Sequence, residues 1–224
     1  MTITPSRIFE VHEAQDGRKR RLYTLNAVPG TAVYGEMLIP TPRGEFREWN
    51  AGKSKLASYI LKGAQGIGMR KGSSVLYLGC ATGTTVSHVS DIIGEEGMVF
   101  AVDISPIVMR DMLFLAEKRG NIIPILENAF HVDRLAKRIS AADVLFQDVA
   151  QRNQVEIFLR NADLFLKDRG YGLLAVKARS IDVAAKPRDI FKAVRKQLEA
   201  KMTIIDYREL DPFQKDHCMF MVKK

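Results

Sequence analysis

Residues 75–103 read VLYLGCATGTTVSHVSDIIGEEGMVFAVD, and this stretch decides the fold. Its first four residues, VLYL, form a short apolar run of the kind that a buried strand requires. A turn rich in Gly and Thr follows, and apolar residues then recur at helical spacing from Val86 to Ile93. A second apolar run at residues 99–102 predicts another strand. The stretch therefore predicts a strand–helix–strand unit of a parallel sheet.

The same alternation continues to the end of the chain. Ser105 and Pro106 predict the start of a helix, with Ser as its cap and Pro in its first turn, and Gly120 predicts its end. The further elements are strands at residues 122–126, 144–146, 171–176, 202–209 and 217–222, and helices at 154–166 and 187–200. A short link joins the last two strands, which are expected to pair antiparallel. We therefore expect an α/β fold, a Rossmann-like seven-stranded sheet with helices on both faces.

The first third of the chain has a different pattern. Residues 8–12 and 21–25 flank the turn dipeptide Asp16-Gly17, which predicts a β-hairpin. Pro and Gly then interrupt further short apolar stretches up to Trp49, the one Trp of the chain. From Ser54 the pattern becomes helical and ends near Gly63. We expect a small β-rich domain at residues 1–53 and an α/β domain at residues 54–224.

The composition excludes several classes of protein. Of 224 residues, 46% are apolar and 27% are charged, as in globular proteins and unlike disordered or collagen-like chains. No apolar run approaches the roughly 20 residues of a membrane span, and the start, MTITPSRIFE, lacks the layout of a signal peptide. Cys80 and Cys218 stand in no metal-ligand spacing, so we expect neither a disulfide scaffold nor a metal site. We expect a soluble, cytoplasmic protein.

The net charge of +8 is unevenly distributed along the chain. Residues 1–74 hold twelve Lys and Arg against six Asp and Glu, a net charge of +6, whereas residues 75–224 have a net charge of +2. The densest basic run lies at residues 18–21. Such a surface suits the phosphates of a nucleic acid. A solvated hairpin end that binds nothing in particular explains the same run, and the charge alone does not separate the two interpretations.

Small and polar residues follow the first two predicted strands of the sheet. The turn at residues 79–85, GCATGTT, allows the main chain to approach a ligand, and Asp103 can accept hydrogen bonds from a ribose. A dinucleotide fold requires G-x-G-x-x-G, but Ala81 and Thr84 stand at its second and third glycine positions. S-adenosylmethionine, which has the adenosine and no pyrophosphate, therefore fits better than NAD. A tight turn without a ligand stays open as the alternative.

Four polar residues are expected near this turn. Asp148 and Lys177 each follow a strand, Lys55 lies on the helix that leads into the sheet, and His217 begins the last strand. A single Lys is usually solvated, and a single His is usually structural. Together around a cofactor pocket, they suit the activation of a weakly acidic hydroxyl by a lysine whose pKa burial or a cationic neighbour lowers, with Asp148 either holding the ammonium in place or offsetting part of its charge.

Six blocks of this sequence resemble the signature blocks of the fibrillarin family. They are NAVPGTAVYGE (26–36), REWNAGKSKLA (47–57), VLYLGCATGTTVSHVSDIIGEEG (75–97), FQDVAQ (146–151), AVKARSID (175–182) and FQKDHCMF (213–220). Their order and approximate spacing match the family over nearly the whole chain. The Gly/Arg-rich tail of eukaryotic members is absent, so the chain is similar to the archaeal type.

The resemblance implies a seven-stranded S-adenosylmethionine-dependent methyltransferase fold and guide-RNA-directed ribose 2′-O-methylation of rRNA, with tRNA as a possible further substrate. The family's catalytic tetrad falls on Lys55, Asp148, Lys177 and His217. In that mechanism Lys177 helps to deprotonate the target hydroxyl, Asp148 positions Lys177, and Lys55 and His217 orient the ribose and its phosphate. The implied cofactor contacts are Gly79, Ala81, Thr84, Thr85, Asp103, Asn128, Ala129, Asp148 and Gln151.

Three positions depart from the family's usual pattern. Asp103 stands where Glu is commoner, Asn128 stands where Asp is commoner, and Cys80-Ala81-Thr82 replaces a more usual Ala-Ser context. These changes concern the affinity for the cofactor and not its class.

The resemblance also implies partners: a box C/D guide RNA, its target rRNA, a Nop-domain scaffold protein and a kink-turn-binding protein, with no membrane involved. The chain has no recognisable RRM or KH module of its own. Two alternatives stay open. One is a stand-alone RNA 2′-O-methyltransferase, a class that usually carries Glu where this chain has His217. The other is a non-catalytic assembly subunit with a vestigial cofactor pocket.

Overall fold

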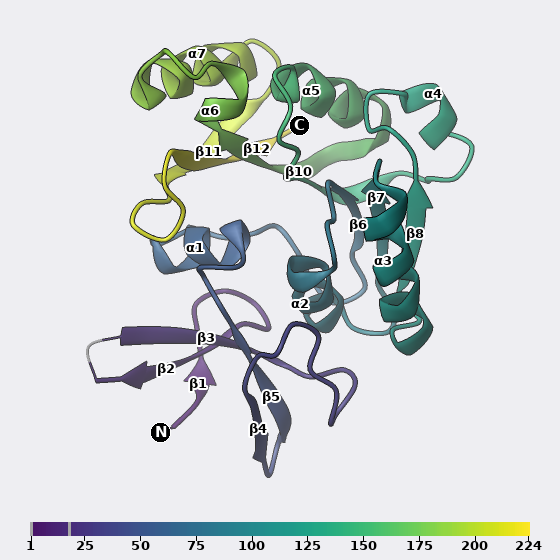
Figure 1. Cartoon of the computed structure of the whole chain (residues 1–224), viewed down its shortest axis with the longest axis vertical. Coiled ribbons are helices and arrows are strands. Elements are labelled where there is room, and N and C mark those ends of the chain that lie inside the picture. Colours follow the sequence, from purple (N-terminus) through teal and green to yellow (C-terminus); the bar gives the residue numbers. More distant parts are fainter. Residues whose placement is uncertain (1, 18) are drawn as a thin grey trace.

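The computed structural model describes residues 2–17 and 19–224, which fold around two β-sheets (Figure 1). Arg18, part of the predicted basic run, lies outside the described residues. The smaller sheet is antiparallel, with strand order β1-β2-β3-β5-β4. Its strands are β1 (Thr4–Pro5), β2 (His12–Asp16), β3 (Lys19–Leu25), β4 (Leu38–Thr41) and β5 (Gly44–Trp49).

The larger sheet has seven strands in the order β11-β12-β10-β9-β6-β7-β8. They are β6 (Ser74–Leu78), β7 (Met98–Asp103), β8 (Ile122–Leu126), β9 (Ala142–Gln147), β10 (Leu166–Lys177), β11 (Thr203–Glu209) and β12 (His217–Lys223). The five strands from β10 to β8 run parallel, and β12 is antiparallel to both of its neighbours. The predicted α/β class and the antiparallel final pair are confirmed.

Seven helices occur in the described chain: α1 (Lys55–Leu61), α2 (Thr84–Ile93), α3 (Pro106–Lys118), α4 (Val132–Leu135), α5 (Gln154–Phe165), α6 (Ala178–Ile181) and α7 (Pro187–Glu199). Helices α1, α2 and α3 cover one face of the larger sheet, and α4 to α7 cover the other (Figure 1). No helix among the residues with a described placement is long and apolar enough to cross a membrane.

Successive side chains of the central strands point to opposite faces of the sheet, and helices cover both faces. The sequences of these strands are therefore continuously apolar. In β6, Val75 and Tyr77 pack into the core under α1, α2 and α3, whereas Leu76 and Leu78 pack into the core under α4 to α7. Because both faces of a parallel sheet are covered, the side chains of such a strand are almost all apolar. The short runs VLYL and VFAV therefore identified β6 and β7 correctly.

The predicted hairpin exists, but its first strand was misplaced. The structure forms this strand at β2, residues 12–16, and not at residues 8–12. Ile8 and Val11 are buried in the main core, and the chain turns there, with the Ser6 N–H donating to the Val11 oxygen. The apolar character of this segment thus reflects burial in a turn and not a strand.

A buried ionic network joins the two sheets. Arg47 of β5 donates from Nε to Glu36 Oε1 over 2.8 Å, and its Nη1 lies 3.2 Å from Asp91 Oδ2 at the end of α2. Arg119, just after α3, contacts the other oxygen of Asp91 over 2.6 Å. All four side chains are at most 2% exposed. The ion pair of Arg47 with Asp91 forms only when both sheets are in place.

His88 of α2 lies beside this network. Its Nδ1 is 2.7 Å from Thr24 Oγ1, which itself donates to Asp91, so Nδ1 carries the proton. The Trp49 ring stacks on the imidazole with 4.8 Å between ring centres. Burial lowers the pKa of His88 well below its ordinary value, and the charges of Arg47 and Arg119 lower it further. His88 is therefore neutral at pH 7.

Candidate active site

The topology gathers the predicted polar residues at one edge of the larger sheet. The carboxyl ends of the parallel strands β6, β7, β8, β9 and β10 meet there, and β12, which runs the other way, begins there. Ligands of open α/β sheets bind at this edge. We call it the catalytic rim, meaning residues 79–85, 103, 128–129, 148–151, 177 and 217 together with Lys55 of α1.

The loop after β6 has a main-chain conformation that most side chains disfavour. Gly79, Ala81 and Gly83 have φ angles of 80°, 48° and 93°. A Cβ on Gly79 would lie 2.6 Å from the main-chain oxygen of Asp148, whereas a Cβ on Gly83 would meet the end of the Leu115 side chain. The left-handed conformation thus favours glycine at both positions, and lack of space requires it at Gly79. The loop leaves its main chain open toward the rim at Ala81, which is exposed.

Asp103 fixes this loop from the end of β7. Its Oδ2 accepts the Ala81 N–H over 3.1 Å, and its Oδ1 accepts the Ser105 N–H over 3.0 Å. Each carboxylate oxygen keeps a further lone pair, and the side chain is half-buried. The carboxylate can accept hydrogen bonds from the two hydroxyls of a ribose without releasing the loop. The residues present therefore fit the adenosine part of S-adenosylmethionine.

The loops after β8 and β9 also place polar groups at the rim. Asn128 Oδ1 accepts the Phe130 N–H over 2.9 Å, which shapes the turn and leaves the Asn128 side-chain NH₂ uncommitted within the described chain. Ala129 is buried beneath this turn. The Gln151 oxygen accepts a hydrogen bond from Gln154 Nε2 over 2.9 Å. These loops therefore have a fixed shape and unused donors that a ligand can engage.

Thr84 and Thr85, predicted to contact the cofactor, lie in different settings. Thr84 is half-buried at the first position of α2. Thr85 is buried, and its hydroxyl donates to Ser54 Oγ over 2.9 Å. Ser54 in turn caps α1 by accepting the Ala57 N–H. The Thr85 side chain thus ties α1 to the glycine loop.

Lys55 and Asp148 form an ion pair at the centre of the rim. The Lys55 Nζ lies 2.9 Å from Oδ1 and 3.0 Å from Oδ2 of Asp148, and the two side chains are 23% and 20% exposed. The Lys177 side chain is exposed, and its Nζ has no hydrogen bond or ion pair to any residue in 2–17 or 19–224. The expected contact between Asp148 and Lys177 is therefore absent from the described chain, and the Asp148 carboxylate pairs with Lys55 instead.

His217 lies opposite Lys177 in the register of β10 and β12. Its Nδ1 is 2.6 Å from the Lys215 oxygen, which only accepts, so Nδ1 carries the proton and the neutral ring has a free lone pair on Nε2. Burial lowers the pKa of His217, and the positive charges of Lys55 and Lys177 act in the same direction. The hydrogen bond to Lys215 and the charge of Asp148 oppose this shift. At neutral pH the ring offers an acceptor at Nε2.

Sequence reasoning missed polar residues that are buried behind the rim. Ser54 was recognised only as the start of a helix, and the two glutamines Gln147 and Gln154 were not singled out, although both are fully buried. The available signal for Gln147 was an amide side chain at the end of an apolar strand, and Gln154 is the first residue of α5, where only its position gave a signal. Such a residue must find hydrogen-bond partners in the interior.

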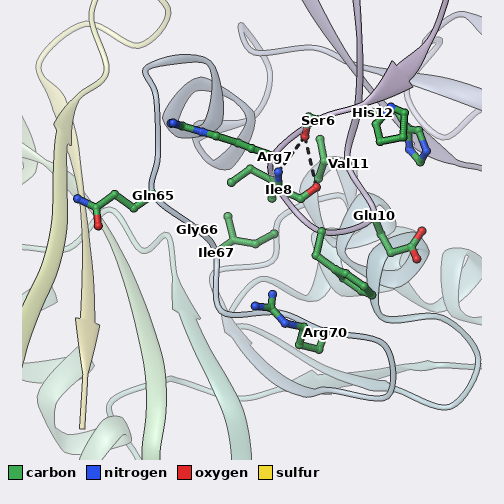
Figure 2. Close-up of a pocket in the computed structure, with 12 residues that line it drawn as sticks. Ser6, Arg7, Ile8, Glu10, Val11, His12, Gln65, Gly66, Ile67 and Arg70 are labelled. Carbon is green, nitrogen blue, oxygen red and sulfur yellow. Dashed lines mark hydrogen bonds between the residues drawn. The ribbon is translucent and has the colours of Figure 1, made fainter.

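A pocket of about 550 Å³ lies away from the rim (Figure 2). Residues 5–12 form one wall, and residues 65–70, which lead into the amino end of β6, form the other. The Arg7 guanidinium donates to the Ala64 oxygen over 2.6 Å, and the Arg70 guanidinium lies over the Phe9 ring. None of the predicted site residues lines this pocket.

Comparisons with known proteins agree on one family. The family model described as Fibrillarin matches residues 3–224. A fibrillarin-like rRNA/tRNA 2′-O-methyltransferase of Thermococcus onnurineus (strain NA1) is 46% identical over 210 residues, 94% of this chain and 92% of the relative. Aeropyrum pernix fibrillarin, crystallised with natively bound S-adenosyl-L-methionine, is 41% identical to this chain, with a TM-score of 0.91. The match covers 99% of this chain and 98% of the Aeropyrum pernix chain. A fibrillarin/Nop5p complex contains a chain that is 37% identical to this one, with a TM-score of 0.87. The match covers 97% of this chain and 99% of the chain in the complex.

Proposed function

The chain belongs to the fibrillarin family, and from this membership we propose that it is the catalytic subunit of a box C/D ribonucleoprotein in which a guide RNA directs ribose 2′-O-methylation of rRNA and tRNA. Its class of enzyme is that of its relatives, an S-adenosylmethionine-dependent RNA 2′-O-methyltransferase. The relatives are archaeal, which supports a cytoplasmic particle.

One observation carries the proposal. The ion pair of Lys55 and Asp148, the exposed Lys177 and the neutral His217 converge on the rim that also holds the glycine loop and Asp103. A base, an acceptor and two fixed charges thus stand beside a nucleoside-binding loop. This arrangement suits proton removal from a hydroxyl next to a methyl donor and has no evident use in a purely structural subunit.

S-adenosylmethionine, when bound, supplies a methyl group that is already activated for transfer to oxygen. The residues that would hold it are Gly79, Ala81, Thr84, Asp103, Asn128, Ala129 and Gln151. Thr85 would contribute indirectly, through its hydrogen bond to Ser54. Asp148 would contribute through the contact of its main-chain oxygen with Gly79. Asp103 would accept hydrogen bonds from the ribose hydroxyls, and the uncommitted NH₂ of Asn128 would be available to the adenine.

The chain's own residues remove the proton and hold the ribose and its phosphate in place. Lys177 in its unprotonated form takes the proton of the target 2′-hydroxyl at Nζ. Asp148 holds the ammonium of Lys55, which faces the neighbouring phosphate, and the Nε2 lone pair of His217 accepts a hydrogen bond from the ribose. Because the methyl group needs no further activation, most of the rate acceleration comes from holding these groups and the ribose in place.

The proposed partners are a box C/D guide RNA with its target, a Nop-domain scaffold and a kink-turn-binding protein. The complex of a relative with Nop5p supports the scaffold. The charge distribution supports delivery of the target by others, because residues 75–224 have a net charge of only +2. Such a surface holds an RNA weakly and without reading its sequence.

Reconstitution tests the proposal. The purified chain, a Nop-domain scaffold, a kink-turn-binding protein and a guide RNA are mixed with target RNA and labelled cofactor, and 2′-O-methyl sites are mapped. We expect methylation at the nucleotide that the guide specifies, and none when the guide or scaffold is left out. Site-specific methylation of bare RNA by the chain alone would identify a stand-alone enzyme. A chain that binds no cofactor would be an assembly subunit.

A further inference from the structure

The carboxyl end of β10 has no neighbouring strand on one side. Strand β9 ends at Gln147, whose partner in β10 is Leu174, whereas β10 continues to Lys177. Strand β12 covers the other side of this extension. The last three residues of β10, which include the proposed base, therefore lack half of the main-chain partners that a central strand has.

The pairing with β12 does not use the Lys177 main chain. The Ala178 N–H donates to the Asp216 oxygen over 3.1 Å, so residues 178 and 216 stand at a hydrogen-bonded position of the ladder, and the His217 oxygen accepts the Leu210 N–H on the side of β11. In an antiparallel ladder such pairs alternate with pairs that exchange none, and Lys177 and His217 form the pair of the second kind. The Lys177 N–H and C=O consequently point toward the side that β9 leaves open.

The carboxamide of Gln154 occupies that open side. Its Oε1 accepts the Lys177 N–H over 3.1 Å, and its Nε2 lies 3.4 Å from the Lys177 oxygen. These are the two contacts that a residue of a neighbouring strand would make. Nε2 also donates to the Gln151 oxygen over 2.9 Å, and Gln147 Nε2 donates to the Gln154 main-chain oxygen over 2.6 Å. The Gln154 side chain thus connects the end of β10 with the loop between β9 and α5, and the Gln147 side chain ties the end of β9 to the Gln154 main chain.

We infer that Gln154 is a positioning residue, which replaces the missing strand and fixes the main chain of Lys177 and of Gln151 at the catalytic rim. Gln154 is 0% exposed, so water cannot take over its hydrogen bonds when the amide is removed. No hydrogen bond or ion pair to a described residue holds the Lys177 side chain, so its placement depends on its main chain. The inference rests on the proposed function for the role of Lys177, but the hydrogen bonds can be tested without it.

The first experiment measures hydrogen exchange of the Lys177 amide by NMR in the free protein. Gln154→Met keeps the length of the side chain and removes the acceptor, and we expect the Lys177 amide to exchange at least tenfold faster. Gln154→Glu keeps an oxygen at the acceptor position, so protection should be restored in large part. Unchanged exchange in Gln154→Met would overturn the inference, and if this variant does not fold, Gln154→Asn, one methylene too short, takes its place.

The second experiment measures single-turnover methyl transfer in the reconstituted particle at saturating cofactor. We expect Gln154→Met to be slower by roughly tenfold to a hundredfold, as small misplacements of a reacting group are, with Gln154→Glu in between. Asn121→Leu is the control, because Asn121 is another buried amide, 8% exposed, that donates to Ser90 and Gly94 far from the rim. The Asn121→Leu variant should be less stable than wild type but should keep the wild-type rate constant for methyl transfer.

Two results would contradict the positioning role: a rate within twofold of wild type for Gln154→Met, or an equal loss in Asn121→Leu. A wild-type particle that methylates nothing would instead contradict the proposed function. The exchange of the Lys177 amide would still decide the inference in that case.

Discussion

At the scale of a single residue, Gly79 links the loop after β6 to the end of β9. Its φ of 80° turns the chain out of β6, and its Cα faces the main-chain oxygen of Asp148 with no room for a Cβ. Strands β6 and β9 can therefore stay paired up to the rim, where the Asp148 N–H donates to Leu78. The position of Asp148 depends on the absence of a side chain at residue 79.

We expect Gly79→Ala to lower the free energy of unfolding by about 2–4 kcal/mol, because it adds left-handed strain to a clash with main-chain atoms. Chemical denaturation measures this loss, and calorimetry should show weaker cofactor binding. Gly30→Ala is the matched control, since Gly30 has a φ of 79° but open space around its Cα. Equal losses in the two variants would show that the contact with Asp148 contributes nothing.

Lys177→Ala should reduce methyl transfer by a factor on the order of 10² or more, the usual contribution of a general base. The cofactor affinity should stay within a few-fold of wild type, since no contact of Lys177 with the cofactor loop exists in the described chain. Labelled methyl transfer in the particle and calorimetry measure the two effects. Lys192→Ala, which removes an equal charge from the exposed face of α7, should keep its activity.

The sequence predicted which residues meet at the rim but not how their side chains pair. Asp148, Lys177 and His217 were placed correctly because each lies at a strand end, and a parallel sheet brings such ends together. The pairing of Asp148 with Lys55 depends on how closely α1 packs against the sheet. No local pattern encodes that distance, and for the same reason the contact of Thr85 with Ser54 was missed.

Helix α1 is the element that connects the smaller sheet to the site. It has seven residues, so its own hydrogen bonds hold it only weakly, and packing and capping must stabilise it. Five of its residues are buried, and Ser54 caps it while receiving the hydroxyl of Thr85. Since Lys55 is the first residue of this helix, the cap determines where the ammonium lies.

Ser54→Ala should lower the free energy of unfolding by about 1–2 kcal/mol, because it removes a cap and leaves the buried Thr85 hydroxyl without its acceptor. We also expect slower methyl transfer, as Lys55 loses its fixed position. Thermal unfolding and single-turnover rates measure both effects. Ser105→Ala removes the cap of α3 in the same way but lies away from Lys55, so it should cost stability alone. An unchanged rate in Ser54→Ala would contradict this role of α1.

Elements of the larger sheet were easier to predict than those of the smaller one. Strands such as β6 and β8 are buried on both faces or bounded by clear turns. Their sequences show this as apolar runs or as turn residues at the ends of the runs. In the smaller sheet, Ile8 and Val11 are apolar because they are buried in a turn, so their pattern imitated a strand. The one-turn helices α4 and α6 are too short for any periodicity to appear.

At the scale of the whole molecule, the interface of the two sheets should make stability depend on pH. His88 is neutral in the folded chain, and its pKa is lowered from the 6.5 of the unfolded chain. Below pH 6.5 the unfolded chain takes up a proton that the folded chain refuses, so the free energy of unfolding falls by up to about 1.4 kcal/mol per pH unit. Above pH 6.5 this contribution is fully present.

Denaturation between pH 5 and pH 8 measures this slope, in a window above the range where carboxylates titrate. His88→Gln should flatten the slope below pH 6.5, although the lowered pKa of His217 preserves part of it. His131→Gln, which changes a histidine with a 45% exposed side chain, should leave the slope as it is. A slope that His88→Gln does not alter would show that the interface titrates elsewhere.

The ionic network between the sheets also restricts how such a protein can change over generations. Glu36 and Arg47 come from the N-terminal half, Asp91 and Arg119 from the larger half, and each half supplies one charge of each sign. The Arg47–Asp91 ion pair and the hydrogen bond that Arg119 donates to Asn26 cross between the halves. Transplanting either half onto another scaffold would leave these buried groups without their partners, at a cost of about 1–3 kcal/mol for each. The β-rich segment is therefore not an exchangeable module, and its inheritance is bound to that of the catalytic half.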